Sequence, residues 1–309
     1  MKAVQIDRYG SSEVLEYGDA PRPKPGAGEV LIRAKATSVN PFDIAARSGY
    51  LAGWYQYDFP LILGLDVAGV IEEKGAGVNH FALGEAVYAR TDPSRNGAYA
   101  EYVLANVDQV AASPKSLDII QAGAMPHVAL TAWALAEMAN LIEGQKVLIH
   151  AAAGGVGHLA VQFARLRGAY VIGTASKRNH EFLYELGADE AIDYTATPFE
   201  NVVKNADAVF DLVGGDTQER SWKTLKPGGI LLSIVQPPSQ ETATKLGVRQ
   251  GFIGYAQPGG QLLAKFAQMV DAGQLKIAVS SVLPLSDIQC AHALIEARHT
   301  RGKLGVEIK

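Results

Sequence analysis

The sequence predicts an α/β fold in which a domain built on a parallel sheet is inserted into a second, strand-rich domain. Three observations support this prediction. Short apolar runs bounded by glycine and proline fill about the first 120 residues, strands and helices alternate through the middle of the chain, and about the last fifty residues mix both. With 309 residues, the chain is long enough for two domains with separate cores.

The strand-rich part is predicted from short runs of β-branched and other apolar residues. We expect strands at residues 3–6, 29–34, 67–71 and 85–89. A turn-rich connector, residues 21–29, separates the first two of these strands.

The middle part alternates between the two kinds of element. Apolar helices are predicted at residues 119–140, 156–167 and 180–186, the last two ended by Gly168 and Gly187. Strands are predicted at residues 146–150, 170–174, 191–194, 208–211 and 229–234. This alternation is typical of right-handed βαβ units and a parallel sheet. Amphipathic helices at 260–272 and 288–297 belong to the C-terminal part.

Composition narrows the class of protein. The net charge of −4, from 28 basic and 32 acidic residues, gives no electrostatic reason to expect nucleic acid or an anionic membrane as partner. The longest apolar stretch, residues 119–142, contains Pro126, His127 and Glu137 and is therefore expected to be buried helix rather than a membrane span. The single cysteine, Cys290, excludes an intrachain disulfide, so we expect a reducing, cytoplasmic location.

A glycine-rich loop follows the strand predicted at 146–150. Residues 151–157 read AAAGGVG, which fits a dinucleotide-binding fingerprint with Ala152 in place of the first glycine. The cofactor-binding residues predicted here are Gly154, Gly155, Val156 and Gly157. Gly154 would let backbone N–H groups approach a pyrophosphate, and Gly157 would let the helix pack closely on the strand. The alternative is a tight strand-to-helix turn that simply needs small residues.

The end of the second strand of this unit indicates which dinucleotide is bound. NAD sites usually place a carboxylate there for the ribose 2′-hydroxyl, whereas this chain has Ser176, Lys177 and Arg178. A hydroxyl and two cations suit a 2′-phosphate, so we expect NADP(H). The alternative is an ordinary solvated turn.

Several glycine-spaced blocks occur in an order typical of a known family. They lie at residues 28–32, 36–43, 64–71, 97–102, 151–157, 186–189 and 227–229. Through them the chain resembles, over essentially its whole length, the quinone oxidoreductase branch of the medium-chain dehydrogenase/reductase superfamily. The resemblance implies a GroES-like catalytic domain at 1–124 and 258–309 around a Rossmann NADP(H)-binding domain at 125–257. It also implies a homodimer paired through an edge strand, for which residues 229–235 are the candidate.

Zinc is not expected, although alcohol dehydrogenases of the same superfamily carry it. The resemblance aligns the three ligand positions of their catalytic zinc with Asn40, Leu65 and His127. One plausible ligand of three cannot hold the metal, and Cys290 alone cannot form a structural site. His127 is then a polar core or cleft residue.

The resemblance also assigns roles around the cofactor and the substrate. Asn40 would lie beside the nicotinamide ribose or the substrate carbonyl, and Thr131 would touch the nicotinamide amide; either residue can instead be structural. Asp43 can orient backbone or cap a helix, and Asp66 is expected to support the site rather than act as a base. Further cofactor contacts implied by the resemblance are Tyr194, Leu212, Val213, Gly214, Ser233, Ile234, Val235, Lys303 and Leu304.

Residues 50–59 form an aromatic-rich segment between two of these blocks. The resemblance makes it a loop that covers the substrate, with Tyr50 as a donor to the developing enolate oxygen. Its alternative role is aromatic packing at a domain edge.

These features predict an NADPH-dependent, zinc-independent oxidoreductase that passes hydride to a quinone or an α,β-unsaturated carbonyl. Two alternatives stay open. One is an enoyl reductase acting on an acyl thioester, which would need a basic patch for the phosphates of the carrier. The other is a non-catalytic NADPH-binding protein, as some relatives serve as crystallins or bind RNA.

Overall fold

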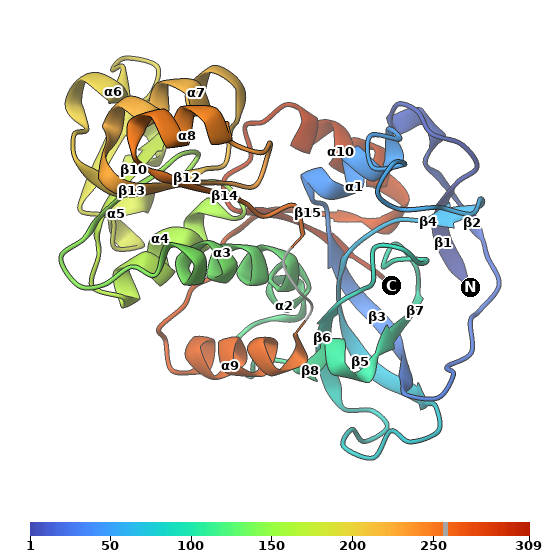
Figure 1. Cartoon of the computed structure of the whole chain (residues 1–309). Helices are drawn as coiled ribbons and strands as arrows, with labels where there is room; N and C mark the ends of the chain where they lie inside the picture. Colours follow the sequence, from blue (N-terminus) through green and yellow to red (C-terminus); the bar gives the residue numbers. More distant parts are fainter. Residues whose placement is uncertain (256–258) are drawn as a thin grey trace. The chain divides into compact units, whose positions relative to one another are not determined.

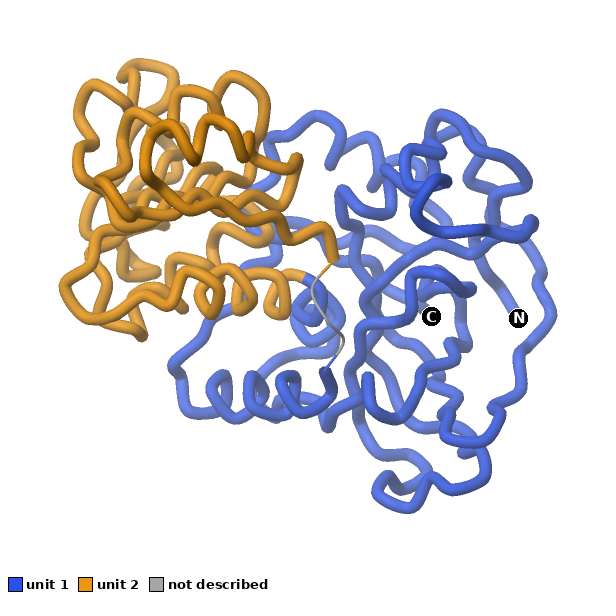
Figure 2. Tube along the Cα trace, in the orientation of Figure 1, with its two compact units in different colours: residues 1–127, 258–309 blue, residues 128–257 orange. Residues whose placement is uncertain are grey.

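The computed structural model of the chain describes residues 1–255 and 259–309, which form two compact units. Unit 1 consists of residues 1–127 and 258–309, and unit 2 consists of residues 128–257 (Figure 2). The first division falls after residue 127, whereas the sequence predicts it after residue 124. The expected division between 257 and 258 lies outside the described residues.

Unit 1 contains two sheets (Figure 1). The smaller sheet has the order β2-β1-β4, with strands β1 (Lys2–Ile6), β2 (Glu16–Asp19) and β4 (Leu61–Ile62). The larger sheet has the order β15-β16-β3-β5-β6-β8, and β7 pairs with β3. Its strands are β3 (Glu29–Ser38), β5 (Asp66–Lys74), β6 (Ala86–Arg90), β7 (Tyr102–Asn106), β8 (Val110–Ala112), β15 (Val279–Pro284) and β16 (Lys303–Glu307).

The helices of unit 1 come from both ends of the chain. They are α1 (Pro41–Arg47), α2 (Ile119–Ala124), α9 (Gly260–Asp271) and α10 (Ile288–Glu296), with short 3-10 turns η1 (Ser12–Val14), η2 (Val107–Gln109) and η5 (Leu285–Asp287). Helix α3 (Pro126–Ala139) begins at the end of this unit. The sequence predicts one helix over 119–140, whereas the structure has two. Pro126 starts the second helix, because its missing N–H costs nothing at a first helical position.

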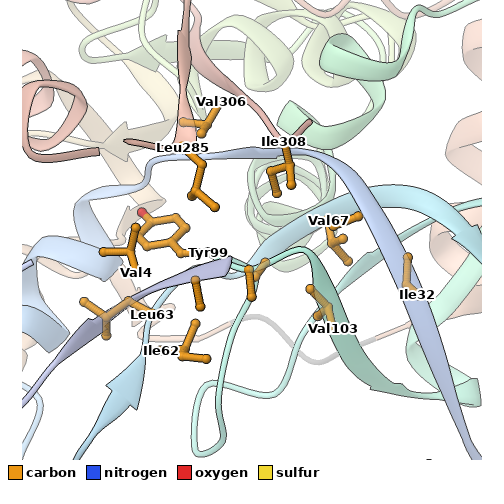
Figure 3. Packing of buried hydrophobic residues seen from close by; sticks show 14 of the residues in the cluster. Val4, Ile32, Ile62, Leu63, Val67, Tyr99, Val103, Leu285, Val306 and Ile308 are labelled. Atoms are coloured by element: carbon orange, nitrogen blue, oxygen red, sulfur yellow. The ribbon is translucent and has the colours of Figure 1, made fainter. Parts of the chain in front are cut away.

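The core of unit 1 joins strands that lie far apart in the sequence. Figure 3 shows the ring of Tyr99 packed among side chains that include Val4, Leu63 and Leu285. Val306 and other C-terminal residues belong to the same cluster, so the last strand completes a core that the first strand begins. Fully burying a valine or leucine side chain stabilises the fold by roughly 1.5–3 kcal/mol.

Unit 2 is built on one parallel sheet of six strands in the order β11-β10-β9-β12-β13-β14. The strands are β9 (Lys146–Ile149), β10 (Tyr170–Ala175), β11 (Glu190–Asp193), β12 (Ala206–Asp211), β13 (Leu225–Ser233) and β14 (Arg249–Phe252). Numbered within the unit, this order is 3-2-1-4-5-6, which defines the Rossmann fold. The predicted α/β fold class is therefore confirmed.

Helices cover both faces of this sheet, with α7 and α8 on one face and α4 on the other (Figure 1). The helices of unit 2 after α3 are α4 (Gly157–Leu166), α5 (His180–Glu185), α6 (Phe199–Val202), α7 (Gly215–Ser221) and α8 (Gln240–Leu246), with 3-10 turns η3 (Lys177–Asn179) and η4 (Trp222–Thr224). A second apolar cluster, which includes Leu148, Val209 and Trp222, lies against the sheet.

One prediction about this sheet is wrong. Residues 229–235 were the expected edge strand for dimer pairing, but β13 lies between β12 and β14 and bonds to both. In the described part of unit 2, β11 and β14 are the two edges.

Candidate functional site

The glycine loop of unit 2 is shaped by backbone contacts at its end. A Cβ atom added at Gly157 would lie 2.3 Å from the carbonyl oxygen of Ala151, so no larger residue fits without moving the backbone. At Gly154 the same oxygen would be 3.2 Å away, a contact that a small shift relieves. Gly155 and Val156 are partly exposed, and α4 begins at Gly157. The loop thus leaves backbone N–H groups open at the start of a helix, as phosphate binding requires.

Ala152 replaces the first glycine of the fingerprint, and the neighbouring strand provides room for it. A Cβ atom at Gly173 in β10 would lie 2.9 Å from the Cβ atom of Ala152. The backbone N–H of Ala152 donates to the carbonyl oxygen of Thr174 at 3.0 Å. The Cβ atom of Ala152 therefore fits because the facing residue of β10 is glycine, a feature that the spacing rule applied to the loop alone does not detect.

The residues predicted to bind the 2′-phosphate directly follow two neighbouring strands that end side by side. Ala175 at the end of β10 pairs with Asp193 at the end of β11, so Ser176 and Tyr194 follow neighbouring chain positions. Lys177 is exposed in η3, and its charge contributes to lowering the pKa of Asp193, after the larger effect of the hydrogen bonds from Thr195. Lys177 and Tyr194 thus lie at the carboxyl ends of two neighbouring strands, where the predicted site would need them.

The ends of β12 and β13 are joined by the buried carboxylate of Asp211. Its Oδ1 atom accepts the backbone N–H groups of Val213 and Gly214 at 3.1 and 2.8 Å. Its Oδ2 atom accepts Gln218 Nε2 and Ser233 Oγ, both at 2.8 Å. The predicted contact segments, residues 212–214 and 233–235, are thus held together by one side chain. Sequence reasoning gave Asp211 and Gln218 no such role, because the bonds join two strand ends.

The two residues predicted to lie beside the nicotinamide belong to different units. Thr131 is buried in α3, within unit 2. Asn40 belongs to the other unit and caps the N-terminus of α1, where Pro41 is the first helical residue. Its backbone N–H donates to Asp43 Oδ2 at 2.8 Å, which completes a capping box.

The side chain of Asn40 lies in a buried polar network of unit 1. Its Nδ2 donates to Asp66 Oδ2 at 2.9 Å, and its Oδ1 accepts from Lys303 Nζ at 2.5 Å. Asp66 also accepts from Ser38 Oγ and from the backbone N–H of His127, both at 2.6 Å. Burial lowers the pKa of Lys303, and the Asp66 carboxylate opposes this effect. A fully buried amide is therefore fixed by one cation and one carboxylate.

Two predicted cofactor contacts lie in the interior of unit 1. Lys303 points into this buried network, and Leu304 lies in the apolar core of unit 1. The sequence shows both residues in a glycine-bounded segment, but it does not show that β16 is an inner strand between β15 and β3.

A second chain of hydrogen bonds links α1 to α10. Arg47 Nη1 lies 3.1 Å from His292 Nδ1, His292 Nε2 lies 3.1 Å from Tyr99 Oη, and Tyr99 Oη donates to Asp43 Oδ2 at 3.0 Å. Arginine can only donate, so Nδ1 accepts and Nε2 carries the hydrogen. Burial raises the pKa of Asp43 to about 7 and lowers that of His292 to about 3. The bond from Tyr99 to Asp43 and the contacts of His292 were not predicted, because these residues lie far apart in the sequence.

Aromatic side chains gather beside α1. Phe42 lies edge-on to Tyr55, with ring centroids 5.9 Å apart, and Tyr55 stacks on Tyr57 at 6.0 Å. Phe42 also lies 6.1 Å from the ring of His127. The predicted donor Tyr50 is 79% exposed and takes no part in these ring contacts. The aromatic segment thus contributes Tyr55 and Tyr57 to the cluster.

A small pocket of unit 1 opens beside this cluster. Its apolar wall consists of Phe42, Ala46, Leu61, Ile62, Leu63 and Leu65. Asp43 and Tyr57 also line it, and the Tyr57 hydroxyl has no hydrogen-bond partner among the described residues. Burial raises the pKa of Tyr57, so this hydroxyl keeps its proton and can donate it in a hydrogen bond.

The residues that the family resemblance aligns with zinc ligands are Asn40, Leu65 and His127. Leu65 is an apolar, buried residue, and burial lowers the pKa of His127 to about 3. Among the residues that the structure describes, no three His, Cys, Asp or Glu side chains come together as a metal site. In the same residues, no helix is long and apolar enough to cross a membrane.

Two family models match the chain. A model described as an alcohol dehydrogenase GroES-like domain matches residues 26–115, and one described as a zinc-binding dehydrogenase matches residues 186–305. A zebrafish protein, "NAD(P)H oxidoreductase RTN4IP1, mitochondrial", is 33% identical, with 100% of this chain and 91% of that protein covered. A spinach protein, "Quinone-oxidoreductase homolog, chloroplastic", is 30% identical, with 99% and 98% covered.

Solved structures of quinone oxidoreductases are similar to this chain over its whole length. A quinone oxidoreductase from Coxiella burnetii has a TM-score of 0.93 and 36% identity, with 100% of this chain and 99% of that chain covered. Escherichia coli quinone oxidoreductase complexed with NADPH has a TM-score of 0.89 and 26% identity, with 99% and 100% covered. A GroES-like domain combined with a Rossmann domain defines the medium-chain dehydrogenases/reductases. The chain belongs to this superfamily and, within it, to the quinone oxidoreductase branch, as its motifs predict.

The comparisons correct the expected location. A cytoplasmic protein was expected from the single cysteine, but relatives that match over the whole chain are named as mitochondrial or chloroplastic. The prediction is wrong because a low cysteine count indicates only a reducing environment, which does not distinguish the cytoplasm from an organelle.

Proposed function

We propose that the chain is an NADPH-dependent oxidoreductase that transfers hydride to a quinone or an α,β-unsaturated carbonyl without a metal ion. The observation that carries this proposal is the state of the first zinc-ligand position. Asn40 occupies it, and its amide is fixed by Asp66 and Lys303. A fixed N–H donor can stabilise negative charge on an acceptor oxygen but cannot replace a metal in activating a simple alcohol.

The cofactor is proposed to bind along the carboxyl ends of the unit 2 strands. Gly154, Gly155, Val156 and Gly157 would receive the pyrophosphate on backbone N–H groups at the start of α4. Ser176, Lys177, Arg178 and Tyr194 would hold the 2′-phosphate. The segments fixed by Asp211 would face the nicotinamide, together with Thr131. When bound, NADPH supplies the hydride. The Escherichia coli neighbour with NADPH supports this assignment.

The acceptor is proposed to bind against unit 1. Asn40 would donate to the acceptor oxygen, and the aromatic rings of Phe42 and Tyr55, beside the small pocket next to α1, would pack against an apolar ring of the acceptor. Within this pocket Tyr57 fits the role of a donor, because its hydroxyl lacks a partner in the described structure. Tyr50 remains a proposed donor that would have to fold over the acceptor from its exposed position.

Metal independence is part of the proposal, although one matching family model carries the name zinc-binding dehydrogenase. Leu65 offers no donor atom, and the carboxylate of Asp66 is already engaged by hydrogen bonds. We expect the purified protein to contain no stoichiometric zinc by elemental mass spectrometry and to keep its activity in EDTA. Loss of activity in EDTA that added zinc restores would contradict the proposal.

Turnover tests the proposed reaction. Purified protein is incubated with NADPH and either benzoquinone, naphthoquinone, an enone or a simple ketone, and oxidation is followed by absorbance. We expect oxidation with at least one quinone or enone and none with the ketone. Tight NADPH binding without turnover of any acceptor would favour a non-catalytic binding protein, and turnover only with an enoyl thioester would favour that alternative.

The 2′-phosphate assignment has its own test. The double variant Lys177→Ala/Arg178→Ala should bind NADPH about 10- to 100-fold more weakly and NADH almost as before, because only NADPH carries the extra phosphate. Fluorescence titration measures both dissociation constants. Lys245→Ala, another exposed lysine of unit 2, is the control. Equal weakening of the two cofactors would show that these residues do not contact the 2′-phosphate.

A homodimer is also proposed. Its pairing strand would be β14, because β13 is an inner strand and β14 lies at the edge of the described sheet. Light scattering after size exclusion should give twice the chain mass of 32.8 kDa.

A further inference from the structure

The side-chain amide of Asn40 is oriented by charge. Lys303 Nζ lies 2.5 Å from Oδ1, and Asp66 Oδ2 lies 2.9 Å from Nδ2. An ammonium group can only donate and a carboxylate can only accept. The opposite orientation of the amide would place its N–H groups against the ammonium and its oxygen against the carboxylate. Only one orientation is therefore compatible with the network.

One donor of this amide remains unused. Nδ2 carries two hydrogens, and Asp66 accepts one of them. The other has no acceptor among the described residues. Asn40 is 0% exposed, so an acceptor oxygen must displace the side chains that cover the amide before it can reach this hydrogen. Once there, it meets the donor away from bulk water, where a hydrogen bond is electrostatically stronger.

Lys303 is buried within the network and contacts three of its oxygen atoms. Its Nζ donates to Asn40 Oδ1 and to the carbonyl oxygen of Val39 at 3.1 Å, and it lies 3.7 Å from Asp66 Oδ2. The first two contacts are hydrogen bonds, whereas the third is an ion pair that is too long for a hydrogen bond. The side chain is 3% exposed. Lys303 is therefore committed mainly to Asn40, Val39 and Asp66.

We infer that Lys303 is a positioning residue for hydride transfer, which orients and polarises the Asn40 amide so that its remaining N–H donates to the acceptor oxygen. This inference rests on the proposed function. Hydride adds to the electrophilic carbon of the acceptor, the π electrons move onto the oxygen, and Asn40 donates a hydrogen bond without giving up its proton. The bond from Lys303 to Oδ1 draws electron density from the amide nitrogen and strengthens this donor.

Kinetics of Lys303→Met separate this role from cofactor binding. We expect kcat to fall about 10- to 100-fold, the loss typical of a misplaced donor, while the Kd for NADPH stays unchanged. Lys24→Met, which changes an exposed lysine of the same unit, is the matched control. Weaker NADPH binding with an unchanged kcat would overturn the inference and make Lys303 a cofactor contact.

A double-mutant cycle tests whether Lys303 acts through Asn40. If it does, Asn40→Ala/Lys303→Met should be no slower than Asn40→Ala alone, because the amide that Lys303 orients is already absent. Additive losses would show that Lys303 acts on the reaction by another route.

A merely structural role is distinguished by restoring the charge balance. Lys303→Met leaves the buried carboxylate of Asp66 without its cation, which can destabilise the fold. Asp66→Asn/Lys303→Met removes both charges and keeps an oxygen that can accept from Nδ2. We expect its Tm to recover while kcat stays low. Recovery of kcat together with Tm would show that the ion pair serves stability only.

One measurement does not depend on turnover. The side-chain NH2 resonances of Asn40, assigned by their loss in Asn40→Ala, should shift and exchange faster in Lys303→Met. Unchanged resonances would overturn the inference whatever the acceptor is. Failure of the wild-type protein to reduce any quinone or enone would contradict the proposed function, whereas the orientation of the amide would still be measured here.

Discussion

One backbone oxygen, that of Ala151, limits which residues the glycine loop can contain. At Gly157 the space for a Cβ atom is taken by a backbone oxygen, whereas at Gly154 the same oxygen lies farther away. Both glycines belong to one fingerprint, so the sequence alone treats them as equivalent. The structure shows that Gly157 is needed for packing, whereas at Gly154 the backbone leaves more space, which the proposed site would use for the pyrophosphate.

This difference predicts different consequences for the two alanine variants. Gly157→Ala should lower the free energy of unfolding by about 1–3 kcal/mol, because backbone must move to admit the methyl group. Gly154→Ala should cost less stability and mainly weaken NADPH binding. Urea unfolding and fluorescence titration measure the two effects. The distinction fails if both variants lose the same stability.

Whole elements were predicted well where the signal is local. The strands 170–174 and 208–211 and the helix 156–167 follow from apolar periodicity and from glycines that end them, and the structure has β10, β12 and α4 there. The sheet order was not readable, because it depends on pairing between distant segments. For the same reason the inner position of β13 was missed.

The candidate site shows the same limit. Asn40 was identified from its motif, but the residues that hold it were not. Lys303 bonds to Asn40 across 263 positions of the sequence, and His292 reaches Tyr99 across 193. No local pattern records such a contact. Lys303 was predicted as a cofactor contact from its segment alone, and its bonds to Asn40 and Val39 could not be read from that segment.

The link between α1 and α10 predicts two opposite effects of pH on stability. The pKa of Asp43 is raised from 3.8 to about 7 in the folded protein, so its contribution to the free energy of unfolding falls as pH rises through that window. The pKa of His292 is lowered from 6.5 to about 3, so its contribution falls as pH drops below 6.5. Between about pH 4 and 6.5 the two groups therefore partly offset each other.

Two variants separate these contributions. Relative to wild type, Asp43→Asn should gain stability as pH rises from 4 to 7, and His292→Gln should gain stability as pH falls from 6.5 to 4. Each unit of removed pKa difference corresponds to about 1.4 kcal/mol. Urea unfolding at a series of pH values measures both slopes, with the exposed His80→Gln as control. Curves parallel to wild type would show that neither group titrates differently on folding.

At the scale of the whole molecule, the chain has two separate hydrophobic cores. The two ends of the chain form one core, and the middle of the chain forms the other. Unit 1 joins residues from both ends of the sequence, and its core contains no tryptophan among the clustered residues. Unit 2 buries Trp222, which is 5% exposed, whereas Trp54 of unit 1 is 69% exposed already in the folded state. Tryptophan fluorescence therefore reports mainly on unit 2.

This asymmetry predicts how NADPH changes unfolding. If the proposed contacts of unit 2 hold the cofactor, NADPH at 100 times its Kd should stabilise the fluorescence transition by about 2.7 kcal/mol. Lys303→Met should leave that increment unchanged, because Lys303 is buried in unit 1 and bonded to Asn40, Val39 and Asp66. Trp54→Phe should keep the transition and thereby confirm its origin. Denaturant titrations with and without NADPH measure the increment in each variant. An increment that disappears in Lys303→Met, while that variant stays folded, would mean that the C-terminal strand contacts the cofactor after all.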